Sequence, residues 1–153
     1  MSEYLETTVD KFVFRIATDR LYSSEGVWAF WAESRGNGRV RIGLTDYVQQ
    51  LNGDVAFAHV KPVGTKLAAG DEFAELETIK ANVSLFSPVG GTVVELNPDL
   101  DLSPEIINQE PYGKGWLAVI EAADWESEHA KLLDPHAYLS AMKLQAEKEL
   151  HGS

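Results

Sequence analysis

The chain has 153 residues, of which 44% are hydrophobic and 10% are aromatic, and this predicts one globular domain with a sizeable core. A net charge of −11, from 24 acidic and 13 basic residues, argues against nucleic acid and anionic membranes as partners, because both are bound through cationic side chains. Without cysteine there are no disulfides or thiolate metal sites, and the acidic start without an apolar segment leads us to expect a cytoplasmic protein.

The first third of the chain predicts β-structure followed by a short helix. Residues 1–20 alternate weakly between apolar and polar and predict a strand or an arm packed on the domain. Two β-rich runs, 27–32 and 39–44, are separated by a glycine-containing turn at 35–38 and predict a hairpin. Thr45 and Asp46 then favour the start of a short helix that ends at Leu51, before Gly53.

The middle of the chain predicts a series of strands joined by turns. Strands are expected at 55–60, 72–78, 82–86, 92–96 and 116–120, with Ile79 and Lys80 at the tip of the hairpin between 72–78 and 82–86. Ser103 and Pro104 predict the start of a short helix, with Ser103 as the N-cap.

The C-terminal part predicts an amphipathic helix from about His136 to Leu150, whose apolar stripe around Leu139 and Met142 is expected to pack on the β-structure. No linker separates this helix from the rest. We therefore expect a single domain over 1–153, with a core at about 25–122, an N-terminal arm at 1–20 and a C-terminal helical segment at about 124–150.

Two similar turns flank Lys80 in the sequence. Residues 61–67 and 87–93 both read polar-Pro-Val-Gly-x-x-apolar, and they are 26 residues apart. This repeat predicts two similar β halves related by a pseudo-two-fold, with Lys80 on the connection between them. A lysine at a hairpin tip suits a covalent attachment point better than a structural role.

Several further motifs carry a family resemblance over residues from about Arg41 to Glu121. They lie at 42–49, 53–57, 70–71, 75–81 and 87–91, and the most specific is the block Asn-Gln-Glu-Pro-Tyr-Gly-Lys-Gly-Trp-Leu at 108–117. In these motifs the chain resembles the glycine cleavage H-protein family of lipoyl carriers. The resemblance implies a mainly β fold: a lipoyl-domain-like β-sandwich (a hammerhead or barrel-sandwich hybrid) of two pseudo-symmetric halves, with short edge helices and a C-terminal helix.

The same resemblance implies that Lys80 carries lipoate through an amide bond, attached by a lipoate ligase or a lipoyltransferase. It makes Glu77, three residues before Lys80, a recognition residue for that enzyme, although an ordinary exposed acid on a strand fits Glu77 equally well. Biotin is disfavoured, because biotin carriers have methionine on both sides of the lysine and the neighbours here are Ile79 and Ala81.

The sequence gives no sign of an autonomous enzyme. It has no Gly-x-Ser-x-Gly motif, P-loop or dinucleotide fingerprint, and its four histidines show no metal-ligand spacing. We expect a non-catalytic carrier whose lipoyl arm swings between partner enzymes, one of them dihydrolipoamide dehydrogenase. An acidic carrier would dock on basic partner surfaces, where opposite charge speeds the encounter.

The chain departs from the family at two points that bear on the pathway. Gly26-Val27-Trp28 stands where the family usually has His-Glu-Trp, and Leu51 stands in a stretch that is often polar. In the family, polar groups in this region contact an arm that carries an aminomethyl cation. A less polar cleft favours a sulfur-carrying lipoate-binding protein that serves a heterodisulfide-reductase-like complex in sulfur oxidation.

Three alternatives stay open at this point. The arm could carry the aminomethyl group for the enzymes of glycine cleavage, or the chain could relay lipoyl groups to other lipoate-dependent enzymes. From a different class, the chain could be an unmodified β-scaffold for protein interaction.

Overall fold

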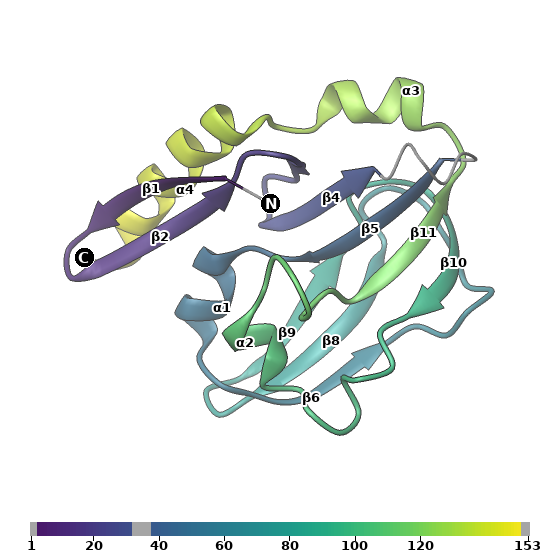
Figure 1. The fold of residues 1–153 in the computed structure, drawn as a ribbon, viewed down its shortest axis with the longest axis horizontal. Coiled ribbons are helices and arrows are strands. Elements are labelled where there is room, and N and C mark those ends of the chain that lie inside the picture. The colour runs from purple at the N-terminus through teal and green to yellow at the C-terminus, as the bar shows by residue number, and fades with distance from the viewer. Residues whose placement is uncertain (1–2, 32–37, 151–153) are drawn as a thin grey trace.

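The fold is described here from a computed structural model, over residues 3–31 and 38–150. Most of the turn predicted at 35–38 lies outside the described residues. Within them, strands dominate and the helices are short apart from the last one (Figure 1).

The described strands form three antiparallel sheets. The largest has six strands in the order β3-β4-β5-β11-β10-β7, and its members are β3 (Leu21–Tyr22), β4 (Val27–Trp31), β5 (Arg39–Leu44), β7 (Lys66–Leu67), β10 (Gly91–Leu96) and β11 (Ala118–Ala122). A three-stranded sheet has the order β6-β8-β9, from β6 (Val55–Val60), β8 (Glu72–Thr78) and β9 (Asn82–Phe86). The third sheet is the hairpin of β1 (Tyr4–Val9) and β2 (Phe12–Ala17). None of them closes into a barrel, and the mainly β sandwich expected from the sequence is confirmed.

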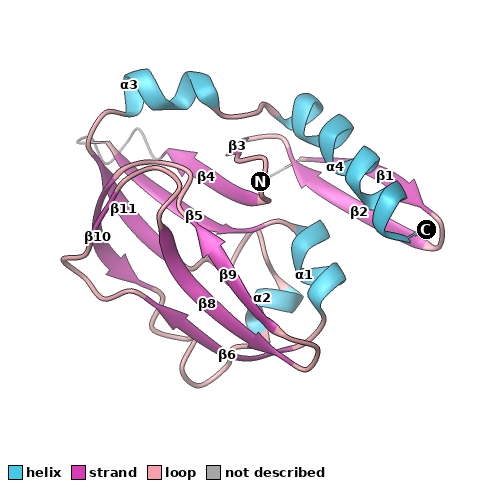
Figure 2. Ribbon diagram, turned by 180° about the vertical axis from the view of Figure 1, so that it is seen from behind, coloured by secondary structure: helices cyan, strands magenta, loops and turns pink. Residues whose placement is uncertain are grey.

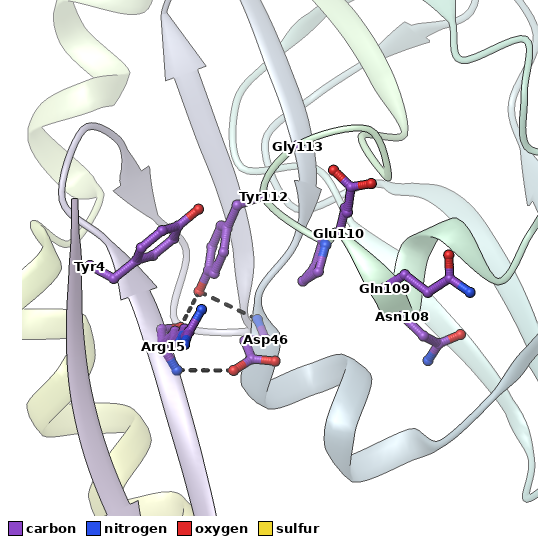
Figure 3. Close-up of a pocket in the computed structure, with 9 residues that line it drawn as sticks. Tyr4, Arg15, Asp46, Asn108, Gln109, Glu110, Tyr112 and Gly113 are labelled. Atoms are coloured by element: carbon purple, nitrogen blue, oxygen red, sulfur yellow. Dashed lines mark hydrogen bonds between the residues drawn. The ribbon is translucent and has the colours of Figure 1, made fainter. Parts of the chain in front are cut away.

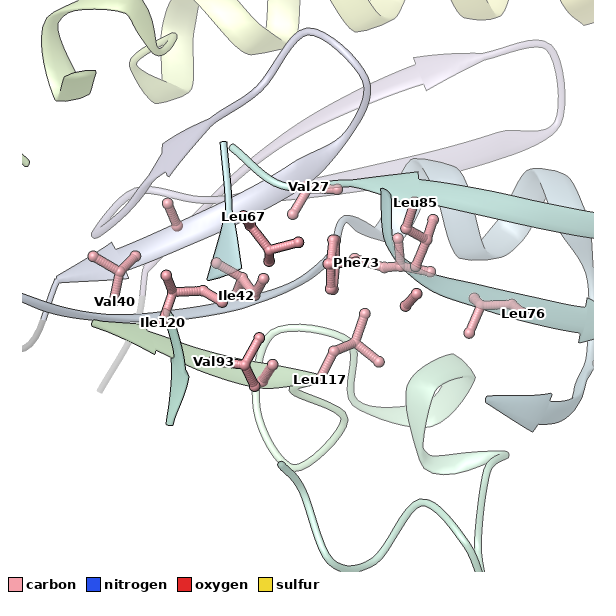
Figure 4. Packing of buried hydrophobic residues seen from close by; sticks show 14 of the residues in the cluster. Val27, Val40, Ile42, Leu67, Phe73, Leu76, Leu85, Val93, Leu117 and Ile120 are labelled. Atoms are coloured by element: carbon pink, nitrogen blue, oxygen red, sulfur yellow. The ribbon is translucent and has the colours of Figure 1, made fainter. Parts of the chain in front are cut away.

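The main core lies between the six-stranded and the three-stranded sheets (Figure 4). Alternate residues of each strand point inward, as the period of two in a strand requires. Buried side chains come from both sheets, among them Ile42, Val93 and Ile120 from the larger one and Phe73 and Leu76 from the smaller one. Each fully buried side chain of this size contributes roughly 1.5–3 kcal/mol, so this core holds the three-stranded sheet firmly against the larger one.

The two repeated turns occupy comparable places in the topology. Residues 62–64 follow β6 and residues 88–90 follow β9, and each turn carries the chain from the three-stranded sheet into the six-stranded one, where β7 and β10 pair. Their surroundings differ, because Val63 is exposed and Val89 is fully buried. The topology therefore agrees with two similar halves, although the turns are not equivalent in packing.

A second core lies on the other face of the large sheet, beneath α4 (Pro135–Leu150). Figure 2 shows α4 running alongside the β1–β2 hairpin. Its buried residues are Tyr138, Met142 and Ala146, whereas Leu139 is half-buried. The expectation that α4 packs on the sandwich was incomplete, because much of its contact is with the hairpin of residues 4–17.

The shorter helices agree with the predictions in part. Helix α1 (Asp46–Asn52) begins after Thr45, whose hydroxyl accepts a hydrogen bond from the Val48 amide, and it ends at Gly53 with φ 79°. The prediction of Ser103 as an N-cap is wrong: α2 (Ile106–Gln109) begins later, after Glu105, and has no side-chain cap. The reason is a tight turn of i→i+3 hydrogen bonds at this point, in which the Ser103 carbonyl accepts from the Ile106 amide.

The region after α2 also starts its strand later than predicted. Trp116 still belongs to a turn, since its amide donates to the Gly113 carbonyl, and β11 begins at Ala118. A short helix α3 (Trp125–Glu128) and a 3-10 turn at His129–Lys131 lead to α4. Of the helices in the described ranges, none combines the length and the apolar character that crossing a bilayer requires.

Candidate functional site

Lys80 lies exposed at the tip of the hairpin between β8 and β9, where it was predicted. The turn is organised by Thr78: its amide and its hydroxyl both donate to the Ala81 carbonyl, at 2.9 and 2.8 Å. The same hydroxyl oxygen accepts from the amides of Lys80 and Ala81, at 3.2 and 3.1 Å. The lysine is therefore displayed on a turn with a defined backbone. The sequence had not indicated that Thr78 would organise this turn.

The hairpin tip is also fastened to the last turn of α1 and to the segment that follows it. The Ile79 amide donates to the Asp54 carbonyl at 3.3 Å, and the Lys80 Nζ donates to the Leu51 carbonyl at 3.2 Å. These contacts set the direction from which the lysine side chain leaves the domain.

Asn108 in turn holds that segment, although sequence reasoning gave it no role of its own. Its side-chain oxygen accepts from the Val55 amide at 3.0 Å, and its side-chain nitrogen donates to the Gly53 carbonyl at 2.9 Å and to Gln49 Oε1 at 3.1 Å. One amide side chain thereby satisfies groups on both sides of Asp54, which in turn contacts the tip of the lysine hairpin. The signal in the sequence was the 108–117 block that Asn108 opens.

Other residues of this block anchor the N-terminal half of the chain. Tyr112 donates its hydroxyl to the Arg15 carbonyl at 2.6 Å and accepts from the Asp46 amide at 3.3 Å (Figure 3). The Pro111 carbonyl accepts from Trp28 Nε1 at 2.9 Å. Burial raises the pKa of the Tyr112 phenol, so Tyr112 stays neutral and remains a donor over the physiological range.

Tyr112 and its neighbours enclose a hollow of about 230 Å³, which lies between the 108–113 segment and the first hairpin (Figure 3). Its charged residues are Arg15, Asp46 and Glu110, and Arg15 is already paired with Glu6 at 3.1 Å. Hydrogen bonds among Arg15, Asp46 and Tyr112 join β2 to α1. We therefore assign the hollow a structural role.

A cleft of about 180 Å³ lies beside Lys80, on the side of the Leu51 carbonyl. It is bounded by α1, α4, strand β9 and the turn before β4, and its lining residues are Ser24, Glu25, Gly26, Tyr47, Val48, Leu51, Asn52, Val83, Tyr138 and Gln145. Glu25 is exposed and brings a carboxylate to this cleft, while Asn52 and Gln145 bring amides. The lining of the cleft is thus mainly apolar, as the sequence suggested, but it includes one carboxylate and two amides.

The departures at Gly26 and Val27 have structural explanations. Val27 is buried in the main core and does not line the cleft. Gly26 has φ 86°, and a Cβ on it would lie 2.3 Å from Val48 Cγ2, so a side chain there would be strained and would clash. The use of Val27 in the argument about the cleft was therefore wrong, whereas Gly26 and Leu51 do line the cleft, and the carboxylate in its lining comes from Glu25.

Glu77 lies on β8, on the outer face of the three-stranded sheet. Its carboxylate forms a short contact with His59 Nε2, and it stands opposite Phe57 in the β6–β8 register. Two apolar residues are exposed on the same sheet and its hairpin: Phe57 on β6, and Ile79 in the turn next to Lys80. Glu77 is thus a partnered residue on an accessible face, three positions from the lysine.

No group of three or more metal-ligating side chains comes together in the part of the chain that the structure describes. The geometry displays an amine on a hydrogen-bonded turn beside a mainly apolar cleft. Such an arrangement suits a covalent attachment point.

Comparison with known proteins decides the family. The model of the family described as "Glycine cleavage H-protein" matches residues 20–145. The chain belongs to the glycine cleavage H-protein family. Curated relatives agree: the glycine cleavage system H protein of Stenotrophomonas maltophilia (strain K279a) is 42% identical over 113 residues, which are 74% of this chain and 86% of the relative. That of Mycobacterium avium (strain 104) is 44% identical over 111 residues, 71% of this chain and 84% of the relative.

The fold agrees with a solved member of the family as well. The crystal structure of a glycine cleavage system H protein from Mycobacterium marinum superposes with a TM-score of 0.72 at 30% identity, over 80% of this chain and 95% of that chain. Membership of a lipoyl-carrying family is thereby established. The preference for a sulfur-carrying protein of sulfur oxidation has no support in these comparisons, and the glycine cleavage alternative fits them better.

Proposed function

We propose that this chain is the lipoyl carrier of a glycine cleavage system and that lipoate is attached to Lys80. The observation that carries the proposal is the exposed Lys80 on the Thr78-organised turn, in a chain of the H-protein family. As a carrier it performs no chemistry of its own and passes its cargo between enzymes.

The residues around Lys80 fit the group. The lysine stands clear of the sheet, so a lipoate ligase or a lipoyltransferase can reach its amine. The turn is fixed by hydrogen bonds, so the modifying enzyme meets one conformation. When attached, lipoate would supply a disulfide at the end of a long arm, and opening of this disulfide would provide one sulfur for the aminomethyl group left by decarboxylation of glycine and a second sulfur as a thiol.

Glu25 is the residue of this chain best placed to favour a cationic cargo. Its carboxylate borders the cleft that begins at Leu51, whose carbonyl already accepts from the Lys80 amine. An anion beside an apolar wall stabilises a positive charge that would otherwise lose hydration. Val83 and Leu51 supply apolar surface for an alkyl arm along the same cleft.

Glu77 is proposed as a recognition residue for the modifying enzyme. It lies on β8 close to the lysine and is held by His59, which fixes the position of its carboxylate. The remaining partners proposed are dihydrolipoamide dehydrogenase and the enzymes of glycine cleavage.

The proposal is tested by reconstitution. Lipoylated protein is combined with the three partner enzymes of a glycine cleavage system, and glycine decarboxylation and methylene transfer are measured. We expect turnover comparable with that of a standard H protein. Glu25→Gln should lower methylene transfer several-fold, whereas Glu95→Gln, a change of an exposed acid on β10, should leave it unchanged. Absence of turnover with fully lipoylated protein would contradict the proposal.

A further inference from the structure

A second groove lies along β6, at the opposite edge of the three-stranded sheet from the cleft beside β9. It has a volume of about 350 Å³ and a mixed polar and apolar lining, and its lining residues are Ala58, His59, Val60, Leu96, Asn97, Pro98, Leu100, Asp101 and Leu117. We call it the β6 groove. Of the residues proposed for the attachment site, Glu77 contacts it, through His59.

One wall of the β6 groove is an edge strand. In the sheet order β6-β8-β9, β6 has β8 as its neighbour on one side, and its other edge faces the loop of residues 96–101. The main-chain groups of an edge strand are available for pairing with an extended segment of another protein.

The other wall is a loop that is fixed from within. The buried Asn97 donates its side-chain amide to the carbonyls of Lys114 and Trp116, both at 2.8 Å, and its side-chain oxygen accepts from the Asp99 amide at 3.0 Å. A hydrogen bond of 2.9 Å from the Ser103 amide to the Asp99 carbonyl closes the loop. A preformed loop loses little conformational freedom when a partner binds, which favours binding.

This loop presents an apolar side chain and two carboxylates to solvent. Leu102 is 90% exposed, the highest value among the exposed large hydrophobic residues. Asp99 and Asp101 are exposed on either side of the buried Leu100, and His59, the basic residue that lines the groove, is paired with Glu77. The surface therefore combines a groove with an apolar part, a projecting leucine and two exposed carboxylates.

We propose that the β6 groove, together with Leu102, is a docking surface for an enzyme that uses this carrier, and that the enzyme offers a basic segment with an apolar side chain that enters the groove. The proposal rests on the proposed carrier function. Opposite charge supplies the attraction, since the rim is acidic and the whole chain has a net charge of −11.

The position of the groove relative to Lys80 favours this assignment. Asp54, which contacts the hairpin tip, lies four residues before Ala58 and six before Val60 along the chain. Since an extended strand rises about 3.3 Å per residue, the groove begins roughly 13 Å from Asp54 and extends to about 20 Å from it. A partner docked there leaves the hairpin tip uncovered. Its surface then lies at about the distance that a lipoyl-lysine arm on Lys80 can span.

The test compares lipoylated variants as substrates of each partner enzyme of a glycine cleavage system. Leu102→Ala removes the projecting side chain, and a double variant, Asp99→Asn with Asp101→Asn, removes the rim charge. Leu144→Ala is the matched control, because Leu144 is 58% exposed on α4. We expect a KM for the carrier that is higher by about tenfold in Leu102→Ala with at least one enzyme, at unchanged kcat. In the double variant the dependence of KM on salt should weaken.

Intact mass confirms full lipoylation of every variant before the assay, so a failure of attachment is separated from a failure of docking. As a second readout, amide resonances of residues 58–60 and 96–102 should shift on addition of the same enzyme. KM values within twofold of the wild type for every enzyme, an equal effect of Leu144→Ala, or a fall in kcat alone would each overturn the proposal.

Discussion

At the scale of single residues, one side chain of the most family-specific block, Asn108, supports the attachment site. Asn108 bonds to main-chain groups of Gly53 and Val55, and Asp54 between them accepts a hydrogen bond from the hairpin that carries Lys80. A residue remote in sequence thus positions the attachment site without touching the lysine. Contacts over this sequence separation are not visible in a local pattern, which is why Asn108 was not singled out.

We expect Asn108→Ala to lower the free energy of unfolding by about 1–3 kcal/mol, because the Val55 amide and the Gly53 carbonyl lose their partner in a partly buried place. The lipoylation rate should fall as well, since the hairpin tip loses its support. Urea unfolding and a timed mass assay with a lipoate ligase measure the two effects. Gln109→Ala, at the exposed neighbouring position, is the control and should change neither quantity.

Tyr47 gives a prediction of the opposite sign. Its hydroxyl is buried and has no hydrogen-bond partner among the residues that the structure describes, and burial raises the pKa of its phenol. Replacement by phenylalanine removes an unsatisfied polar group and keeps the edge-on contact with Phe14, whose ring centroid lies 5.3 Å away. Tyr47→Phe should therefore leave the melting temperature unchanged or raise it. A loss of more than about 1 kcal/mol would show that the hydroxyl is bonded in solution.

At the scale of elements, sequence patterns predicted correctly those strands and turns that depend mainly on neighbouring residues. Strands β8 and β9 have the predicted bounds, because each alternates between apolar and polar residues and the two are separated by a short turn. The start of α2 was missed because a turn of i→i+3 bonds competed with the Ser-Pro cap signal. Glu25 was missed as a residue of the cleft because α1, α4 and β9 meet there from distant parts of the chain.

The hairpin of β1 and β2 shows a further limit of sequence patterns. Residues 1–20 alternate weakly, since Phe12 and Val13 are exposed while Phe14 and Ile16 are buried. The pattern is explained by α4, which packs against the hairpin and shares a core with Phe14 and Ile16. The family model begins at residue 20, so the hairpin lies outside the matched part of the chain.

Deleting the residues after Asp134 tests this packing. The deletion removes Tyr138, Met142 and Ala146 from the second core and uncovers Phe14 and Tyr22. Burial of one large apolar side chain contributes roughly 1.5–3 kcal/mol, so we expect the melting temperature to fall clearly and dye binding to exposed apolar surface to increase. An unchanged melting temperature would mean that α4 does not contribute to the domain, and the expectation of a single domain over 1–153 would fail with it.

At the scale of the whole molecule, buried tyrosines couple the fold to alkaline pH. Burial is the main cause that raises the pKa of Tyr22, Tyr112 and Tyr138 above the usual value of about 10. These residues join β3, the 108–117 block and α4 around the second core. Their burial favours the neutral phenol in the folded state.

The sign of the pH dependence follows from these shifts. With a pKa higher in the folded state than in the unfolded state, the tyrosines contribute stability that is fully present below pH about 10 and is lost as the pH rises through their folded values. We expect tyrosinate absorbance and loss of β-structure by circular dichroism to change together above pH about 10. Ionisation of all tyrosines at their usual pKa, with the fold intact, would contradict the assigned burial.

Intact mass is the most direct test of the attachment at Lys80. Wild-type protein, Lys80→Arg and the control Lys66→Arg, which changes an exposed lysine on β7, are expressed in a host that makes and attaches lipoate. The account predicts the mass of one lipoyl group on the wild type and on Lys66→Arg, and no addition on Lys80→Arg, because arginine offers no amine that can be acylated. An unmodified wild type, or a lipoyl group that persists in Lys80→Arg, would contradict it.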